Sequence, residues 1–196
     1  PLSRATVNHP WKEHDDEEDP ARRRFRYPTG ADKMKSPIPD LAHGLSCLST
    51  ILAKAERHCE SHKIDPDALL KARLYPDMFH LTRNVTTACD AAKFTAARLS
   101  QTEPPRYEDN ETSFAELQAR IAKTIAFLET IPDGAFTTAE TRDLAVPLAP
   151  AGTEPNGQTY LARFGIPNFY FHLVTSYNIL RHNGIALGKR DFLWVS

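Results

Sequence analysis

The residues best suited to chemistry lie near the end of the chain, in the segment 157–190, where polar side chains sit among aromatic ones. Asn168 and His172 are four residues apart, so a helix would place both on one face. Such a histidine can act as an acid, a base or a ligand, and we take His172 as the candidate catalytic residue. The candidate ligand-binding residues beside it are Phe164, Asn168 and Phe171. The alternative is that His172 is a core residue held by a hydrogen bond.

A buried polar pair of this kind needs hydrogen-bond partners from a facing element. The alanine-rich segment 76–100 is the natural source, and we expect the partner to come from residues 77–84. This stretch adds three candidate ligand-binding residues, His80, Arg83 and Asn84.

Other motifs with a recognisable chemistry are absent from the sequence. There is no Gly-rich phosphate loop, GxSxG turn, HExxH pair or CxxC pair, so the familiar nucleotide, serine-hydrolase and zinc-protease mechanisms are not indicated. His58 and His62 share a helical face, but their charged surroundings favour a solvated surface. The three cysteines, Cys47, Cys59 and Cys89, follow apolar patterns and are expected to be small buried residues.

Composition limits the partners. The chain has 196 residues and a formal net charge of -1, which suits one domain and gives no electrostatic reason to expect nucleic acid or a membrane surface. No apolar run approaches the roughly 20 residues that span a bilayer. The N-terminus lacks the apolar core of a secretory signal, so we expect a cytoplasmic protein.

Residues 1–35 differ from the rest of the chain. An acidic run is followed by a basic run, with several prolines and almost no apolar periodicity. Such a segment buries too little surface to offset the entropy of ordering, so we expect a disordered or loosely attached extension. The folded domain is then expected to cover residues 36–196.

The remaining sequence alternates helical patterns with breakers. Leu41, Leu45, Leu48 and Leu52 show the three-four spacing of an amphipathic helix, and similar stripes recur along the chain. The expected long helices cover about residues 38–62, 76–100, 113–131 and 157–190, with a short extra helix at 66–73 and an irregular crossover at 135–156. Four long helices with one longer connection predict an all-α four-helix bundle.

Signals inside the last helix refine this expectation. Gly165 and Pro167 favour a kink, and a kink can open space for a ligand. Asn183 and Gly184 supply a left-handed stop.

Four segments resemble a DinB-related family of unknown function that is found in bacteria and fungi. They are LYPDMF (74–79), YEDNETSFAELQARIAKTIAFLE (107–129), PNFYFH (167–172) and ILRHNGIALGKRDFL (179–193). The resemblance covers about residues 38–193 and implies the up-down-down-up helical bundle of the wider DinB/YfiT-like superfamily. Many members of that superfamily bind a divalent metal through three histidines and act as thiol-dependent transferases or isomerases.

The resemblance also allows the metal ligands to be checked by position. Metal-binding relatives usually carry His-x-x-x-His about a dozen residues before a glycine, and counting back from Gly184 places the second histidine at His172 and the first at Asn168. The third ligand would fall near His80 or Asn84. An asparagine oxygen is a poor replacement for imidazole, and catalytic zinc needs three protein ligands. We therefore expect neither a metal nor another cofactor.

These observations favour a protein that binds or transforms a small metabolite in an aromatic groove around His172, without a bound metal. One alternative is a divalent-metal-dependent transferase or isomerase that uses His172, His80 and one unidentified ligand. Another is a non-catalytic interaction module that forms a homodimer through one face of the bundle.

Overall fold

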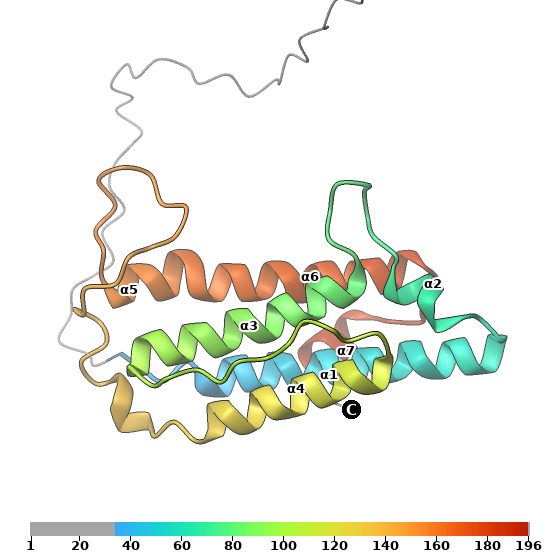
Figure 1. The fold of residues 1–196 in the computed structure, drawn as a ribbon, viewed down its shortest axis with the longest axis horizontal. Helices are drawn as coiled ribbons and strands as arrows, with labels where there is room; N and C mark the ends of the chain where they lie inside the picture. The colour runs from blue at the N-terminus through green and yellow to red at the C-terminus, as the bar shows by residue number, and fades with distance from the viewer. Residues whose placement is uncertain (1–33, 196) are drawn as a thin grey trace, which may run out of the picture. The chain divides into compact units, whose positions relative to one another are not determined.

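The computed structural model describes residues 34–195, and the expectation for the N-terminal extension falls almost entirely outside them. The described part is all-α, as predicted, and its long helices run side by side (Figure 1). They are α1 (Ile38–His62), α3 (Leu81–Ser100), α4 (Phe114–Glu129) and α6 (Ile166–His182). Met34, which was assigned to the extension, is half-buried against the core.

The predicted amphipathic stripes make the core. Leu41, Leu45, Leu48 and Leu52 of α1 are completely buried, and the other long helices contribute matching apolar faces. Helix α3 packs against both α4 and α6, and α1 packs against α4, α6 and α3. This arrangement confirms the four-helix bundle. No helix within residues 34–195 is long and apolar enough to cross a membrane.

Local signals fix several helix ends. Ser113 and Glu116 form the predicted capping box at the start of α4. The short helix α2 (Pro66–Leu70) begins with Asp65 as its N-cap, as predicted, but ends three residues before Arg73. The crossover after α4 is irregular, with a 3-10 turn η1 (Asp133–Phe136) and an isolated bridge between Asp143 and Asn156.

Helix α3 begins later than the sequence predicted. We expected a start near Pro76, but residues 74–79 form turns and the helix starts at Leu81. The reason is His80, whose Nδ1 accepts a hydrogen bond from the backbone N–H of Arg83 at 3.3 Å and so caps the helix. The turns before it are tied together because the Arg73 guanidinium donates to backbone carbonyls of that loop.

The last helix is continuous but irregular. It starts as α5 (Gly157–Tyr160), passes through a π-helical turn η2 (Leu161–Gly165) and continues as α6. The π-helical turn occurs where we predicted a kink, immediately before Pro167, whose nitrogen cannot donate a backbone hydrogen bond. The stop predicted at Asn183 and Gly184 is confirmed, because α6 ends at His182 and Gly184 adopts φ 90°. The rest of the segment 157–190 does not continue the helix, and a separate short helix α7 (Lys189–Leu193) follows.

Glycine permits a close approach of α3 and α6 at this turn. A Cβ atom at Gly165 would lie 2.8 Å from the Cγ2 atom of Thr95, a buried residue of α3. The same two helices carry the predicted polar residues, so this contact helps to fix the spacing at the candidate site.

Candidate functional site

Asn84 of α3 and His172 of α6 meet in the seam between the two helices. The Nδ1 atom of His172 lies 3.0 Å from Oδ1 of Asn84. The Asn84 amide nitrogen donates to the backbone carbonyls of Phe79 at 2.8 Å and His80 at 3.1 Å. Its oxygen must therefore be the acceptor for His172, which places a hydrogen on Nδ1. The prediction of a polar partner from residues 77–84 was made for both Asn168 and His172, and it is confirmed for His172 alone.

This pairing leaves the second ring nitrogen of His172 as a lone-pair acceptor. The residue is only 7% exposed, and Nε2 makes no hydrogen bond to any residue of the described range 34–195. Burial lowers the pKa of His172, and the positive charge of Arg83 lowers it further, so the ring is neutral at pH 7. A neutral imidazole with a fixed tautomer is suited to accept a proton or a hydrogen bond at Nε2.

Two exposed aromatic rings surround the buried imidazole. Phe79 stacks on His172 with a centroid distance of 6.1 Å and an interplanar angle of 14°. Phe171 meets the same ring edge-on, with centroids 5.1 Å apart. Phe79 is 49% exposed and Phe171 is 59% exposed, so their rings are available to a ligand. We call the set Phe79, Arg83, Asn84, Phe171 and His172 the His172 patch.

Arg83 supplies the positive charge of this patch. Its guanidinium lies 5.6 Å from the centroid of the Phe79 ring and its Nη1 donates to Oδ2 of Asp109 at 2.5 Å. Burial acts to raise the pKa of Asp109, but the hydrogen bonds and charges of Arg83 and Arg120 outweigh it and lower the pKa. Asp109 is therefore ionised at neutral pH and balances Arg83.

The other predicted site residues lie outside this cluster. Phe164 is half-buried and packs against Tyr160, with ring centroids 5.7 Å apart. Asn168 is half-buried and hydrogen-bonds to no residue in the described part of the chain. His80 serves as the helix cap described above. Phe79 was not singled out from the sequence, although its place in LYPDMF, directly before the facing helix, was a usable signal.

The described residues do not fit the three-histidine metal site that the resemblance implies. His80 is committed elsewhere, because its Nδ1 accepts a hydrogen bond from the backbone N–H of Arg83. The side-chain oxygen of Asn84 is occupied by His172. Among residues 34–195, no group of three His, Cys, Asp or Glu side chains could hold a metal ion.

A second polar cluster was missed by the sequence analysis. Arg120 of α4 is completely buried and binds three carboxylates, those of Asp90 at 2.8 Å, Glu111 at 2.9 Å and Asp109 at 3.2 Å. Lys93 is 3% exposed and shares Asp90 at 2.8 Å. The sequence did contain a signal for this cluster. Arg120 is a charged residue in the apolar stripe of α4, between Leu117 and Ile121, and it follows the acidic run 108–111.

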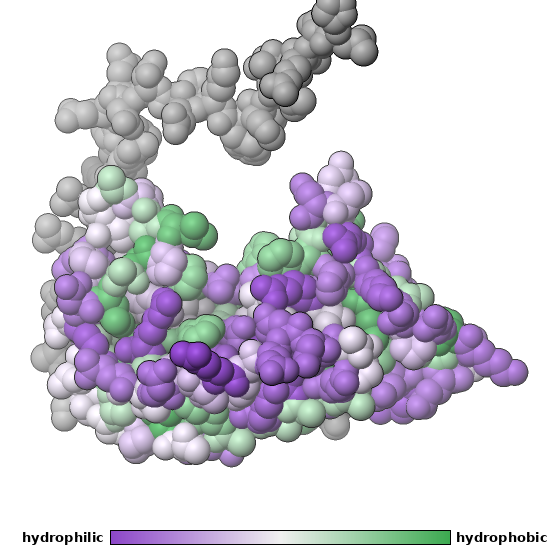
Figure 2. All heavy atoms as spheres, viewed as in Figure 1, coloured by the Kyte–Doolittle hydropathy of each residue, from purple (hydrophilic) through white to green (hydrophobic). Residues whose placement is uncertain are grey.

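Tyr107 closes this cluster from the loop that joins α3 to α4. Its ring lies under three cations, Lys93 at 4.1 Å, Lys123 at 4.4 Å and Arg120 at 4.6 Å. Figure 2 shows mainly hydrophilic residues over the middle of the face where α3 and this loop lie. The cluster joins charges from three segments and ties the loop to the bundle, which is a structural role.

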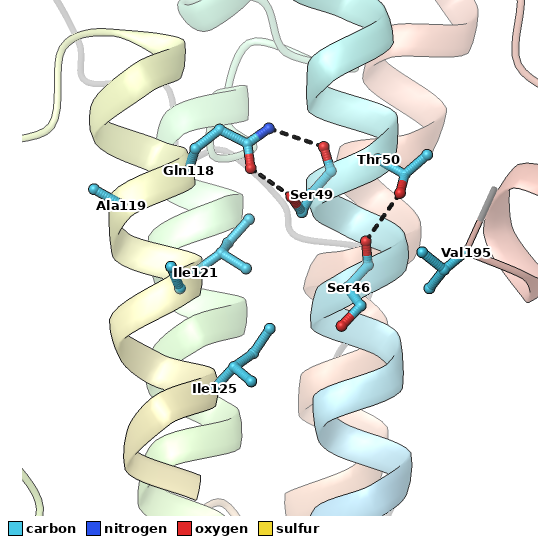
Figure 3. Close-up of a pocket in the computed structure, with 9 residues that line it drawn as sticks. Ser46, Ser49, Thr50, Gln118, Ala119, Ile121, Ile125 and Val195 are labelled. Atoms are coloured by element: carbon cyan, nitrogen blue, oxygen red, sulfur yellow. Dashed lines mark hydrogen bonds between the residues drawn. The ribbon is translucent and has the colours of Figure 1, made fainter. Parts of the chain in front are cut away.

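A concave region of about 530 Å³ lies elsewhere, between α1 and α4. Gln118 joins the two helices there, because it accepts from Ser49 Oγ at 2.5 Å and donates to the Ser49 carbonyl at 2.9 Å (Figure 3). Among the described residues, those lining this groove include no imidazole, thiol or charged group. The groove therefore offers serine and threonine hydroxyls, but its lining has no side chain that could act as a base to activate them.

The cysteines are buried, as predicted. Burial raises the pKa of Cys89 to about 12 and also raises the pKa of Cys47 and Cys59. These thiols are protonated at neutral pH and are poor nucleophiles.

The bundle of α1, α3, α4 and α6 makes the chain an all-α protein, and a solved structure of similar fold shows that the bundle is DinB-like. Residues 35–193 match the family described as "Domain of unknown function (DUF1993)", and the chain belongs to this family. A solved DinB family member protein from Shewanella denitrificans has 39% sequence identity and a TM-score of 0.76. The similarity covers 81% of this chain and 90% of that one. No curated protein matches the sequence.

Proposed function

We propose that this protein binds or transforms a small metabolite at the His172 patch, without a bound metal. The observation that carries the proposal is the hydrogen bond between His172 and Asn84, which fixes a neutral ring and leaves Nε2 without a protein partner. Nε2 of His172 is not among the buried polar atoms without a partner, unlike Arg120 Nε and Glu111 Oε2, so it is reachable from solvent. A ligand donor can therefore take the place of water at Nε2.

The patch has the parts of a small-molecule site. The exposed rings of Phe79 and Phe171 provide apolar surface for the body of a ligand. His172 provides a directional acceptor, since Asn84 restrains the ring. If Nε2 takes a proton from the ligand, the Nδ1 hydrogen stays on Asn84 and the amide oxygen faces the new positive charge. The same geometry thus supports either binding or general-base chemistry.

A homodimer is the second candidate, and one observation favours it. Large apolar side chains are exposed on α6 and on the loop before α3, namely Leu74, Tyr75, Phe79, Phe171 and Val174. Exposed apolar surface of this kind can bind a protein partner as well as a metabolite. Solution mass distinguishes the two, because a dimer through this face would dissociate in Phe171→Glu and the wild-type protein would be dimeric.

The test is a metabolite screen by ligand-observed NMR on three proteins: wild type, His172→Phe and His182→Phe. The control residue His182 is exposed at the far end of the same helix. We expect compounds that bind wild type and His182→Phe to lose binding to His172→Phe, with all three proteins folded. Binding that survives in His172→Phe would refute the proposal. One metal ion per chain, lost in His172→Ala, would favour the metal-dependent transferase instead.

A further inference from the structure

Arg83 lies at the edge of the His172 patch with part of its side chain in solvent. The side chain is 45% exposed, and the guanidinium approaches the same Phe79 ring that stacks on His172. Arginine presents a planar fork of donors that matches a carboxylate in a bidentate arrangement. A ligand resting on the Phe79 ring would therefore meet a cation suited to an acid group.

In the free protein Arg83 forms an ion pair with Asp109, but this ion pair is weak. The Asp109 side chain is 38% exposed, and exposed ion pairs contribute little to stability. Its other oxygen, Oδ1, is held by Arg120 Nη2 at 3.2 Å. Asp109 can thus release Arg83 and still keep a buried partner. The exchange leaves no carboxylate without a counter-ion, which is the usual obstacle to such a replacement.

We propose that the ligand of the His172 patch carries a carboxylate next to a flat apolar body, and that the carboxylate replaces Asp109 on Arg83. The inference rests on the proposed function, since it names the substrate class for the same site. The two exposed phenyl rings hold the flat body, and Arg83 binds the acid. A hydroxyl or amine of the ligand would complete the site by donating to His172 Nε2.

The charges around the His172 patch favour an anionic ligand over a cationic one. Arg83 lowers the pKa of both His172 and His80 after the larger effect of burial, and Arg73 also lowers the pKa of His80. These arginines create a positive field that a carboxylate would reduce. The neutral histidines add no competing charge at pH 7.

The experiment compares two probes of the same shape, 3-phenylpropanoate and its neutral amide 3-phenylpropanamide. Binding is measured by NMR titration that follows the His172 ring, with wild type, Arg83→Gln, Asp109→Asn and the control Arg181→Gln. We expect wild type and the control to bind the acid about tenfold more tightly than the amide. Arg83→Gln should bind both probes equally. Asp109→Asn should bind the acid about two- to fivefold more tightly, the factor that corresponds to an exposed ion pair.

The outcomes separate this inference from the proposed function. If wild type binds acid and amide equally, and ligand-observed NMR shows that His172→Phe binds neither, the carboxylate inference is overturned and the metabolite site stands. A preference for the acid that persists in Arg83→Gln would also overturn it. If neither probe shifts the His172 signals at millimolar concentration, the carboxylate inference is wrong, and the metabolite screen alone decides the proposed function.

Discussion

Two buried polar clusters share helix α3 and differ in almost every other respect. Toward α6, Asn84 pairs with a neutral His172 whose Nε2 has no protein partner within residues 34–195. Toward α4, Asp90 pairs with the fully buried Arg120, which also holds Glu111. The first cluster is neutral and lies beneath exposed aromatic rings, whereas the second is charged and closed by Tyr107.

This difference indicates that the His172 patch is suited to binding a ligand, whereas the Arg120 cluster stabilises the fold. In the Arg120 cluster each charged group has opposite charges beside it, so a ligand would have to break several ion pairs. In the His172 patch the protein restrains one ring nitrogen and leaves the other to an outside donor. Asp109 links the two clusters, because it contacts both Arg83 and Arg120. The Arg120 cluster therefore holds Asp109, the loop residue whose charge balances Arg83 in the His172 patch.

Removal of the buried arginine should have the largest effect on stability. Arg120→Ala leaves Asp90 and Glu111 without their main cation, and we expect the free energy of unfolding to fall by about 3–5 kcal/mol. Urea unfolding followed by circular dichroism measures this. The control Lys123→Ala removes an exposed cation over Tyr107 and should cost no more than about 1 kcal/mol. If both variants lose the same small amount of unfolding free energy, the Arg120 cluster does not stabilise the fold.

A smaller loss is expected at the contact between α3 and α6. Gly165→Ala places a methyl group against the buried Thr95 side chain, which should cost about 1–3 kcal/mol. Gly134→Ala is the matched control, because nothing lies within 4 Å of its Cβ position, and it should change stability by no more than about 0.5 kcal/mol. Thermal unfolding of both variants checks this. An unchanged melting temperature in Gly165→Ala would mean that the seam is loosely packed.

The His172 patch should tolerate a substitution that the Arg120 cluster would not. His172→Phe nearly conserves the aromatic volume but leaves the Asn84 oxygen unpaired, so we expect a loss of about 1–3 kcal/mol and a folded protein. Urea unfolding and NMR spectra report both quantities. Failure of this variant to fold would favour His172 as a structural core residue.

Acidification should weaken the protein slightly through the histidines near Arg83. Folding lowers the pKa of His172 and His80 below 6.5, so the unfolded chain binds protons first as the pH falls. Their contribution to stability is complete above about pH 6.5 and declines below it. We expect a shallow decrease in the free energy of unfolding from about pH 7.5 to about pH 5.5. The double variant His172→Phe, His80→Asn should flatten this slope, and an unchanged slope would contradict the assignment.

Local patterns in the sequence predicted most of the fold. The leucine spacing of α1 and the Ser113–Glu116 capping box acted as expected, because both depend on neighbours within a few residues. The facing partner of His172 was also predictable from the polar residues before the alanine-rich stripe. The start of α3 was not, since His80 replaced the expected helical turn by capping.

Tertiary contacts account for what the sequence did not reveal. The acidic loop 108–111 and Arg120 are near in sequence, but Asp90 joins them from another helix, and only packing shows that all three share one cluster. The exposure of Phe171 likewise depends on how α6 is rotated in the bundle. A helical pattern predicts which residues share a face, but the neighbouring helices decide what that face contacts.

The most direct test of the account is the protonation state of His172 in the free protein. Nitrogen-15 NMR of the histidine rings distinguishes the two neutral tautomers and the imidazolium form. We expect that at pH 7 His172 is neutral, carries its hydrogen on Nδ1 and has an unprotonated Nε2. A hydrogen on Nε2, or a charged ring at pH 7, would contradict the proposed site.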